Sequence, residues 1–195
     1  DMHDAEAYLA HMLNDMSERN YEYNFDVDDL LHGLFDNSEF PYSEKQKQAI
    51  AAAARNGLVI LTGGPGTGQT TTGSGIWRVF EARSLNPLLA APTGRAAKRL
   101  SELTGRKAST IHRLLEVDYT GGVVSFIHND KNLLKCDVVI LDEMSMVDVK
   151  LFQALIAALR YSCRIIMVGD ADQLPSVGPG NILGETIRSG LVPTV

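Results

Sequence analysis

A glycine-rich segment that follows an apolar run is the feature that most constrains the fold of this chain. Leu58–Thr62 is apolar without alternation, and Gly63–Thr70 continues it as GGPGTGQT. The segment matches the pattern G-x-x-x-x-G-K-[ST] except at Gln69. Glycines at these positions let backbone N–H groups converge on phosphate oxygens, and the start of a following helix adds positive potential. The segment therefore predicts a strand, a phosphate-binding loop and a helix in succession.

Short apolar runs alternate with helical stretches along the rest of the chain. Runs without polar alternation are typical of strands that are buried on both faces of a parallel sheet. The predicted strands are Leu58–Thr62, Leu88–Ala91, Val138–Leu141 and Ile165–Val168, and the predicted helices lie at 43–54, 71–84, 94–104, 109–116 and 147–160. Gly121 and Gly122 are suited to a small hairpin turn. This order predicts an α/β fold of the P-loop NTPase kind, with helices flanking a parallel sheet.

The first 40 residues differ from the remainder in charge and in pattern. They contain eleven acidic side chains and one basic side chain, whereas residues 41–195 contain thirteen acidic and seventeen basic side chains. Apolar residues recur at helical spacing from Ala5 to Met16 and again from Val27 to Phe35. We expect two short helices that pack on the body or belong to a domain upstream. The predicted division is a helical tail of an N-terminal domain at 1–40 and an ATP-binding domain at 41–195.

Composition excludes several other classes of protein. The chain has no run of about 18 apolar residues, as a membrane helix needs, and its acidic beginning lacks the apolar core of a signal peptide. Cys136 and Cys163 alone make no metal cage, and because both stand beside apolar runs they are predicted to be buried structural thiols, with a disulfide as the less favoured alternative. We therefore expect a cytoplasmic protein with no membrane partner.

Gln69 stands where this type of loop has a lysine. The lysine contacts the β- and γ-phosphates and neutralises charge as the γ-phosphoryl group leaves. Glutamine can donate a hydrogen bond but carries no cation, and loss of a charge-assisted contact costs about 1.5–3 kcal/mol. The loss is larger in the transition state, where charge accumulates. The sequence thus predicts weak nucleotide binding and very poor hydrolysis.

Polar residues follow two of the predicted strands. Asp142 and Glu143 come directly after Val138–Leu141, and Gln173 lies in the string GDADQLP after the last strand. In P-loop enzymes the first carboxylate helps to hold Mg²⁺, and the second is suited to orient or deprotonate water. Gln173 can bond both a γ-phosphate and a water. The predicted catalytic residues are Glu143, Gln173 and Gln69, and the predicted Mg²⁺ ligands are Thr70 and Asp142.

Basic residues gather between positions 95 and 113. Six are present, and Glu102 alone opposes them. Such clusters attract phosphate backbones by releasing counterions, although a solvated basic helix face remains an alternative. The N–H groups of a helix start can contact the same phosphates. The predicted DNA contacts are Pro92, Thr93, Gly94, Arg95, Lys98, Arg99, His112 and Arg113.

Taken together, these strings resemble superfamily 1 helicases, most closely the RecD-like branch that includes the exonuclease V alpha subunit. The matching strings are YSEKQ at 42–46, the loop Gly63–Thr70, APTGRAAKRL at 91–100, STIHRLL at 109–115, LDEMSM at 141–146, and 169–180. The resemblance implies a first RecA-like motor domain of an ATP-dependent helicase that moves 5′→3′ along single-stranded DNA in repair or recombination. It implies ATP and Mg²⁺ as cofactors, with adenine read by Gln46 and the γ-phosphate sensed by Gln173. Expected nucleotide contacts are Gln46, Gly63, Gly64, Pro65, Gly66, Thr67, Gly68, Gln69, Thr70 and Thr71.

Two departures from the family pattern change the expected activity. One is Gln69, and the other is the end of the sequence at Leu191–Val195, where the family would begin a second motor domain with an arginine for the γ-phosphate. We therefore expect a fragment that hydrolyses ATP poorly. The alternatives are a non-hydrolysing nucleotide-dependent binding module and another P-loop ATPase such as a clamp loader. If the chain is a helicase motor domain, we expect other subunits of a repair or recombination complex among its partners.

Overall fold

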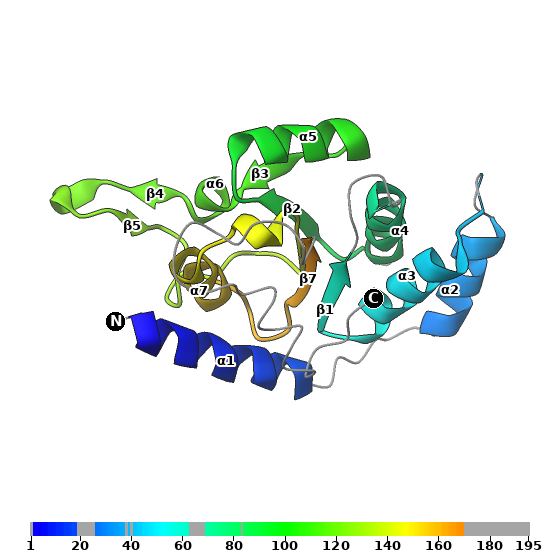
Figure 1. Ribbon diagram of the computed structural model, residues 1–195, viewed down its shortest axis with the longest axis horizontal. Coiled ribbons are helices and arrows are strands. Elements are labelled where there is room, and N and C mark those ends of the chain that lie inside the picture. Colours follow the sequence, from blue (N-terminus) through cyan, green and yellow to red (C-terminus); the bar gives the residue numbers. More distant parts are fainter. Residues whose placement is uncertain are drawn as a thin grey trace.

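The computed structural model of the chain describes residues 2–18, 26–37, 39, 41–62, 69–82 and 84–169. Within these ranges, five parallel strands form one sheet in the order β1–β7–β6–β2–β3 (Figure 1). The strands are β1 (Leu58–Thr62), β2 (Pro87–Ala91), β3 (Ala108–Thr110), β6 (Val138–Leu141) and β7 (Arg164–Gly169). Helices cover both faces of this sheet, which confirms the predicted α/β fold.

The side chains of β1, β6 and β7 alternate between two hydrophobic clusters, one on each face of the sheet. Leu58 and Ile60 of β1 belong to the first cluster, and Val59 and Leu61 belong to the second. The first cluster is covered by α1 (Met2–Glu18), α6 (Ile111–Leu115) and α7 (Val149–Ala157). The second is covered by α2 (Val27–Asp36), α3 (Glu44–Arg55), α4 (Gln69–Glu81) and α5 (Gly94–Thr104). Burial on both faces explains why β1, β6 and β7 are mainly apolar, whereas the edge strand β3 is only partly buried and contains Ser109 and Thr110.

The two N-terminal helices pack on the body, which was one of the two expected alternatives. Leu9, Leu13 and Met16 of α1 are buried in the first cluster beside α7. Leu31 of α2 is buried against α3 and α4, and Asp28 forms an ion pair with Arg55. The apolar stripes read from the sequence are thus packing faces. The division between an N-terminal tail at 1–40 and an ATP-binding domain at 41–195 stays a prediction.

Strand β3 was not predicted from the sequence, whereas the glycine turn of the hairpin was. Residues 109–110 were expected in a helix, but they are the last two residues of β3, which pairs with β2. Thr110 is also the N-cap of α6. The predicted glycine turn is present, within a 3₁₀ turn at Thr120–Gly122. It joins β4 (Val117–Asp118) to β5 (Ser125–Phe126), and this hairpin projects from the body (Figure 1). A three-residue strand is too short to show a periodicity of its own.

Cys136 and Cys163 are both free thiols with 0% of their surface exposed, as expected of buried thiols. Among the described residues, no helix is long and apolar enough to span a bilayer.

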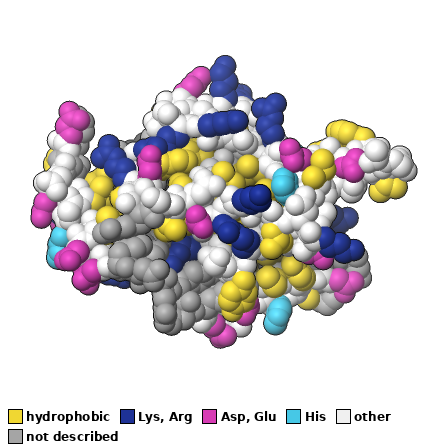
Figure 2. All heavy atoms as spheres, turned by 180° about the vertical axis from the view of Figure 1, so that it is seen from behind, with side chains coloured by type: hydrophobic (Ala, Val, Ile, Leu, Met, Phe, Trp, Pro, Cys, Tyr) yellow, Lys and Arg dark blue, Asp and Glu magenta, His cyan; other side chains and the backbone are white. Residues whose placement is uncertain are grey.

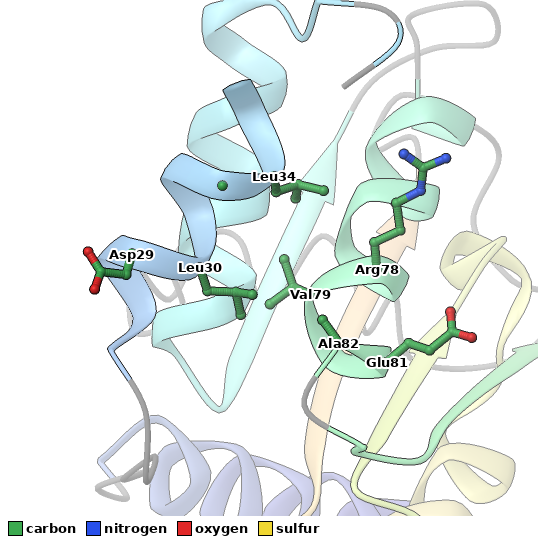
Figure 3. Close-up of a pocket in the computed structure, with 8 residues that line it drawn as sticks. Asp29, Leu30, Leu34, Arg78, Val79, Glu81 and Ala82 are labelled. Carbon is green, nitrogen blue, oxygen red and sulfur yellow. The ribbon is translucent and has the colours of Figure 1, made fainter. Parts of the chain in front are cut away.

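A cavity of about 550 Å³ lies between α2 and the last turns of α4. Figure 3 shows Leu30 and Leu34 of α2 directed toward Val79 of α4, while Asp29 and Glu81 point away. Because α4 begins after the phosphate loop and this cavity adjoins its other end, the cavity lies away from the predicted nucleotide site.

Helix α4 contains two glycines, and the structure accounts for one of them. A Cβ atom placed on Gly75 would lie 2.6 Å from Ile50 Cδ1 and 3.2 Å from the Tyr42 ring. Ile50 is fully buried, so it has little room to move away. Gly75 therefore permits the close approach of α3 and α4. A Cβ atom on Gly73 meets no described atom within 4 Å, and nothing in the structure explains that glycine.

The two glycines make a matched pair of stability variants. We expect Gly73→Ala to raise the free energy of unfolding by about 0.5–1 kcal/mol, because alanine is the better helix former. Gly75→Ala gains the same propensity but overpacks the contact with Ile50, which typically costs about 1–3 kcal/mol. Urea unfolding followed by circular dichroism measures both. Equal stability of the two variants would contradict the close-approach explanation.

Candidate nucleotide-binding site and nucleic-acid interface

Parallel pairing brings the segments that follow the strands to one edge of the sheet. Thr62, the last residue of β1, pairs with Gly169, and Leu141 of β6 pairs with Met167. The Asp142 N–H donates to the Ala90 carbonyl at 2.9 Å, so Asp142 lies beside the end of β2. The predicted polar segments therefore converge at the carboxyl edge, where open α/β sheets bind their ligands.

The phosphate loop has the expected flanks. Strand β1 ends at Thr62 and α4 begins at Gln69. The predicted nucleotide contacts Gly63, Gly64, Pro65, Gly66, Thr67 and Gly68 lie outside the described residues, as does Gln173. Gln69, Thr70 and Thr71 form the first turn of α4, and their side chains are likewise outside the description. The strand–loop–helix order required by the motif is thus present around the loop.

Asp142 and Glu143 follow β6 in an unusual backbone conformation. Glu143 has φ 55° and ψ 41°, in the left-handed region that side chains other than glycine rarely adopt. Its N–H donates to Asp142 Oδ1 at 2.9 Å, and buried Met144 begins the next 3₁₀ turn. Left-handed backbone costs about 1–2 kcal/mol for such a residue. The chain therefore turns sharply here and holds two consecutive carboxylates at the sheet edge.

Both carboxyl groups are harder to ionise than usual. Burial raises the pKa of Asp142, against the lowering effects of the Glu143 N–H and the Arg99 charge. Burial also raises the pKa of Glu143, and the neighbouring Asp142 charge adds to the increase. Arg99, on α5, is a cation whose charge acts on both. A pair of half-buried carboxylates with this electrostatic strain is suited to a divalent cation.

Helix α5 begins at the same edge and carries most of the basic residues. Thr93 is its N-cap, and the Thr93 hydroxyl accepts from the Ala96 N–H at 3.2 Å. Arg95, Lys98 and Arg99 are exposed, whereas Ala97 is buried against the sheet. Figure 2 shows dark blue side chains gathered at the top of the molecule, where Figure 1 places α5. Three cations and a helix start thus share one exposed surface.

Arg106 is occupied within the protein, although the sequence placed it in the basic cluster. Its guanidinium bonds Glu81 of α4 at 3.0 Å and lies 4.7 Å from the centroid of the Trp77 ring. Cation–π and ionic contacts of this kind hold α4 to the segment between α5 and β3. The helix that follows the phosphate loop therefore contacts the chain just beyond the helix that carries the basic surface.

His112 and Arg113 lie beyond β3, on the short helix α6. Both are exposed, and the His112 ring centroid is 6.1 Å from that of Phe126 in the hairpin. The Thr110 hydroxyl caps this helix by accepting from the Arg113 N–H at 3.1 Å. Because Ala91 pairs with Thr110, these residues stand beside Pro92, Thr93 and Gly94. The structure thus brings the eight predicted DNA contacts onto neighbouring segments.

Gln46 has a local structural role that the motif did not indicate. Its Oε1 accepts from the Ser43 N–H at 2.9 Å, and the Ser43 hydroxyl accepts from the Gln46 N–H at 3.2 Å. These reciprocal bonds are a capping box at the start of α3. The box fixes the Gln46 side chain, and its reading of adenine stays a prediction.

Sequence reasoning missed three features of this edge. They are the strained backbone of Glu143, the charge of Arg99 acting on the acidic pair, and the capping roles of Thr93 and Thr110. The caps had a signal, because threonine immediately before a helical stretch is a preferred N-cap. The other two depend on contacts between elements that are distant in sequence.

Comparison with known protein families assigns the chain to one of them. A sequence model described as "AAA domain" matches residues 46–179, which include every segment at the edge. The chain belongs to this AAA domain family, in the RecD-like branch of superfamily 1 helicases. This family match confirms the predicted RecD-like motor domain.

Curated relatives of this RecD-like domain are DNA helicases or helicase subunits by name. It is 45% identical over 138 residues to an ATP-dependent RecD2 DNA helicase of Deinococcus radiodurans, across 71% of this chain and 19% of that protein. It is 38% identical to the RecBCD enzyme subunit RecD of Mycolicibacterium smegmatis, across 74% of this chain and 30% of that protein. The ATP-dependent DNA helicase dda of phage T4 is 40% identical across 71% of this chain and 34% of its own length. The chain thus spans about a third or less of these relatives.

Solved structures share the fold of this RecD-like domain. The UvsW helicase of bacteriophage T4 superposes with a TM-score of 0.61 at 13% identity, covering 90% of this chain and 68% of that chain. A structure described as DNA unwinding at forked dsDNA by two coordinating Pif1 helicases gives a TM-score of 0.50 at 23% identity, covering 77% and 38%. At these identities the likeness supports the fold alone.

Glu143→Gln tests the electrostatic strain of the acidic pair. The raised pKa values mean that the charged carboxyls destabilise the folded state. The ordinary pKa values are 3.8 for Asp142 and 4.5 for Glu143, and below them both carboxyls are protonated and the folded state has its full stability. As the pH rises through the raised pKa values of the folded state, the carboxyls ionise and part of this stability is lost. We expect Glu143→Gln to raise Tm at pH 7 by about 1–3 °C, a modest change because the group is partly solvated.

The same comparison at acid pH supplies the internal control. Below both ordinary pKa values the Tm difference should vanish, and Glu39→Gln, at an exposed glutamate between α2 and α3, should change Tm little at either pH. Differential scanning calorimetry measures each case. A lower Tm for Glu143→Gln at pH 7 would contradict the prediction.

Proposed function

We propose that this chain is the ATP- and DNA-binding first motor domain of a helicase that moves 5′→3′ along single-stranded DNA. The observation that carries the proposal is the convergence of three elements at one sheet edge. They are the flanks of the phosphate loop, the pair Asp142–Glu143 and the start of the basic helix α5. The direction of movement rests on the family resemblance. Relatives named as ATP-dependent DNA helicases support the assignment.

The proposed cofactor is ATP with Mg²⁺. The backbone of residues 63–68 would cradle the phosphates, with Thr70 and Asp142 as Mg²⁺ ligands and Gln173 at the γ-phosphate. The strained, half-buried carboxyl pair supports this placement, because a divalent cation would relieve the unfavourable charge. Glu143 would orient or deprotonate the attacking water from its fixed left-handed backbone. Gln46 would read adenine, and Thr71 would lie in the phosphate-binding turn.

Gln69 makes this chain a poor hydrolase under the proposal. The loop would still bind nucleotide through its backbone N–H groups and the start of α4. It would lack the cation that offsets negative charge as the γ-phosphoryl group transfers. This same residue favours the second candidate function, a module that binds nucleotide without hydrolysis and thereby orders its DNA- or protein-binding surface.

The proposed DNA surface consists of the start of α5 and the adjoining α6. Arg95, Lys98 and Arg99 would neutralise backbone phosphates, and Thr93 with the neighbouring N–H groups would position one phosphate. The brace from Arg106 to α4 gives a physical route by which nucleotide and DNA can influence each other. Partners from recombination or repair are proposed because several relatives are named as subunits of the RecBCD enzyme.

Restoring the lysine tests the role of Gln69. In the 195-residue chain we expect Gln69→Lys to tighten Mg²⁺–ATP binding about 10- to 100-fold, because it restores a charge-assisted contact. Trp77 is the single tryptophan and lies on α4, so its fluorescence can report the titration. Gln153→Lys on α7 adds the same charge elsewhere and should leave the affinity unchanged.

Turnover distinguishes the two candidate functions. The assay uses the natural protein that contains these 195 residues, at its full length. There, Gln69→Lys should raise DNA-stimulated ATP hydrolysis by about 100-fold or more, because the lysine acts mainly in the transition state. Equal rates for the two forms would exclude the proposed role of Gln69. A Gln69→Lys form that binds tightly yet stays inactive would favour the non-hydrolysing module.

Neutralising the basic surface tests the DNA proposal. We expect the triple variant Arg95→Gln, Lys98→Gln, Arg99→Gln to bind a labelled oligo-dT strand at least about tenfold more weakly at low salt. The slope of log affinity against log salt should become shallower by about 2, as three single-strand phosphate contacts are lost. Fluorescence anisotropy measures both quantities.

A control variant with the same change in charge makes this measurement specific. Lys131, Lys135 and Lys150 are exposed cations outside the proposed surface, and changing all three to glutamine removes an equal charge. This control should keep most of the affinity. If the two triple variants lose equal affinity, DNA binding depends on overall charge and the proposed surface is wrong.

A further inference from the structure

Two cysteines form a buried pair at the sheet edge opposite the proposed ATP site. Cys136 precedes β6 by two positions and Cys163 directly precedes β7, and these strands are neighbours. Their Sγ atoms are 3.6 Å apart, and one thiol donates a hydrogen bond to the other. They are the only cysteines of the chain. A disulfide needs a sulfur separation of about 2.05 Å, so the two atoms must approach by about 1.5 Å.

The turn from α7 to β7 packs over this pair through Arg160. Arg160 Nη2 donates to the Cys136 carbonyl at 2.8 Å and bonds Asp137 Oδ1 at 3.2 Å. The Cys163 N–H donates to the Arg160 carbonyl at 3.0 Å, so one residue contacts both cysteine backbones. Tyr161, in the same turn, is 69% exposed. Opening this solvent-facing turn is therefore the shortest change in the described fold that separates Arg160 from Cys136.

We propose that Cys136 and Cys163 are a redox modification site, in which a small peroxide joins them into a disulfide and Arg160 controls access to them. The bond would crosslink the amino ends of β6 and β7 and close a loop across 27 positions of sequence. A crosslink of this span restricts the unfolded chain and stabilises the fold. The proposal is independent of the proposed helicase function, because the pair takes no part in the ATP or DNA edge.

The two thiols are chemically distinct, which assigns their roles. The hydrogen bond with Cys163 lowers the pKa of Cys136, against the effect of burial, and the Arg160 charge lowers it further. The same hydrogen bond and burial raise the pKa of Cys163. The Arg160 guanidinium bonds the Cys136 carbonyl at 2.8 Å, so its positive charge lies beside Cys136, which is the attacking sulfur, and Cys163 is the resolving one.

The reaction balances with hydrogen peroxide as the oxidant. The Cys136 thiolate attacks one peroxide oxygen, the O–O bond breaks, and hydroxide leaves and becomes water with the proton that Cys136 released. Cys163 Sγ then attacks the sulfur of the resulting sulfenic acid, and the S–O bond breaks. The departing oxygen leaves as a second water that carries the Cys163 proton. Two thiols lose two electrons in total, and one peroxide is reduced to two water molecules.

Treating the 195-residue chain with hydrogen peroxide tests the site. We expect both thiols to become unreactive together in a denaturing thiol titration, with a monomer lighter by two hydrogen atoms in mass spectrometry. Tm should rise by about 5 °C and return on addition of dithiothreitol. Cys136→Ala and Cys163→Ala should show no such rise. Two titratable thiols after treatment, oxygen added to a single cysteine, or a crosslinked dimer would each overturn the proposal.

Variants of the turn test the control by Arg160. Arg160→Lys keeps the charge that lowers the Cys136 pKa but has fewer donors to hold the turn, so it should form the disulfide at least about fivefold faster than the parent. Arg160→Gln also frees the turn but loses that charge, so it should react faster than the parent and more slowly than Arg160→Lys. Lys135→Gln removes a charge next to Cys136 without touching these bonds and should react like the parent. If both Arg160 variants react no faster than Lys135→Gln, Arg160 does not control access.

Discussion

Parallel hydrogen bonding among β1, β7, β6 and β2 is the interaction on which the rest of the structure depends. The register that sets Thr62 beside Gly169 and Leu141 beside Met167 brings the end of β1, the acidic pair and the start of the basic helix to one edge. A shift of one residue in register would move each side chain into the cluster on the opposite face, where it would no longer fit the side chains packed there. The packing of the hydrophobic core thus sets the positions of the polar residues at this edge, although none of those residues belongs to the core.

Helices α4 and α5 link the halves of this edge. Gly75 lets α4 approach α3 closely, and Arg106, two residues beyond the end of α5, contacts Glu81 and Trp77 of α4. Neither contact involves a residue that would meet a ligand. Both nevertheless fix the direction in which α4 leaves the phosphate loop and in which α5 presents its cations. Arg99 extends the connection, since it belongs to the basic surface and its charge also reaches the acidic pair.

The sequence predicted the fold and the composition of the site better than its local conformations. β1, β6 and α5 begin and end as expected, because unbroken apolar runs and capped helices have strong local signals. β3 was missed because three residues are too few for a pattern, and it is held by pairing with β2. The backbone of Glu143, the engagement of Arg106 and the proximity of the two thiols arise from contacts between distant segments, which no short string of residues encodes.

The left-handed backbone at Glu143 has a consequence for how such a chain can evolve or be engineered. Glycine adopts this conformation without the steric conflict that a Cβ atom creates. A selection that rewards thermal stability alone would therefore be drawn toward glycine at position 143 and would remove the carboxylate. Under the proposed function, keeping glutamate at this position therefore carries a cost in stability. Among variants of this domain selected for thermal stability, keeping or losing Glu143 would show whether the selection also required the carboxylate.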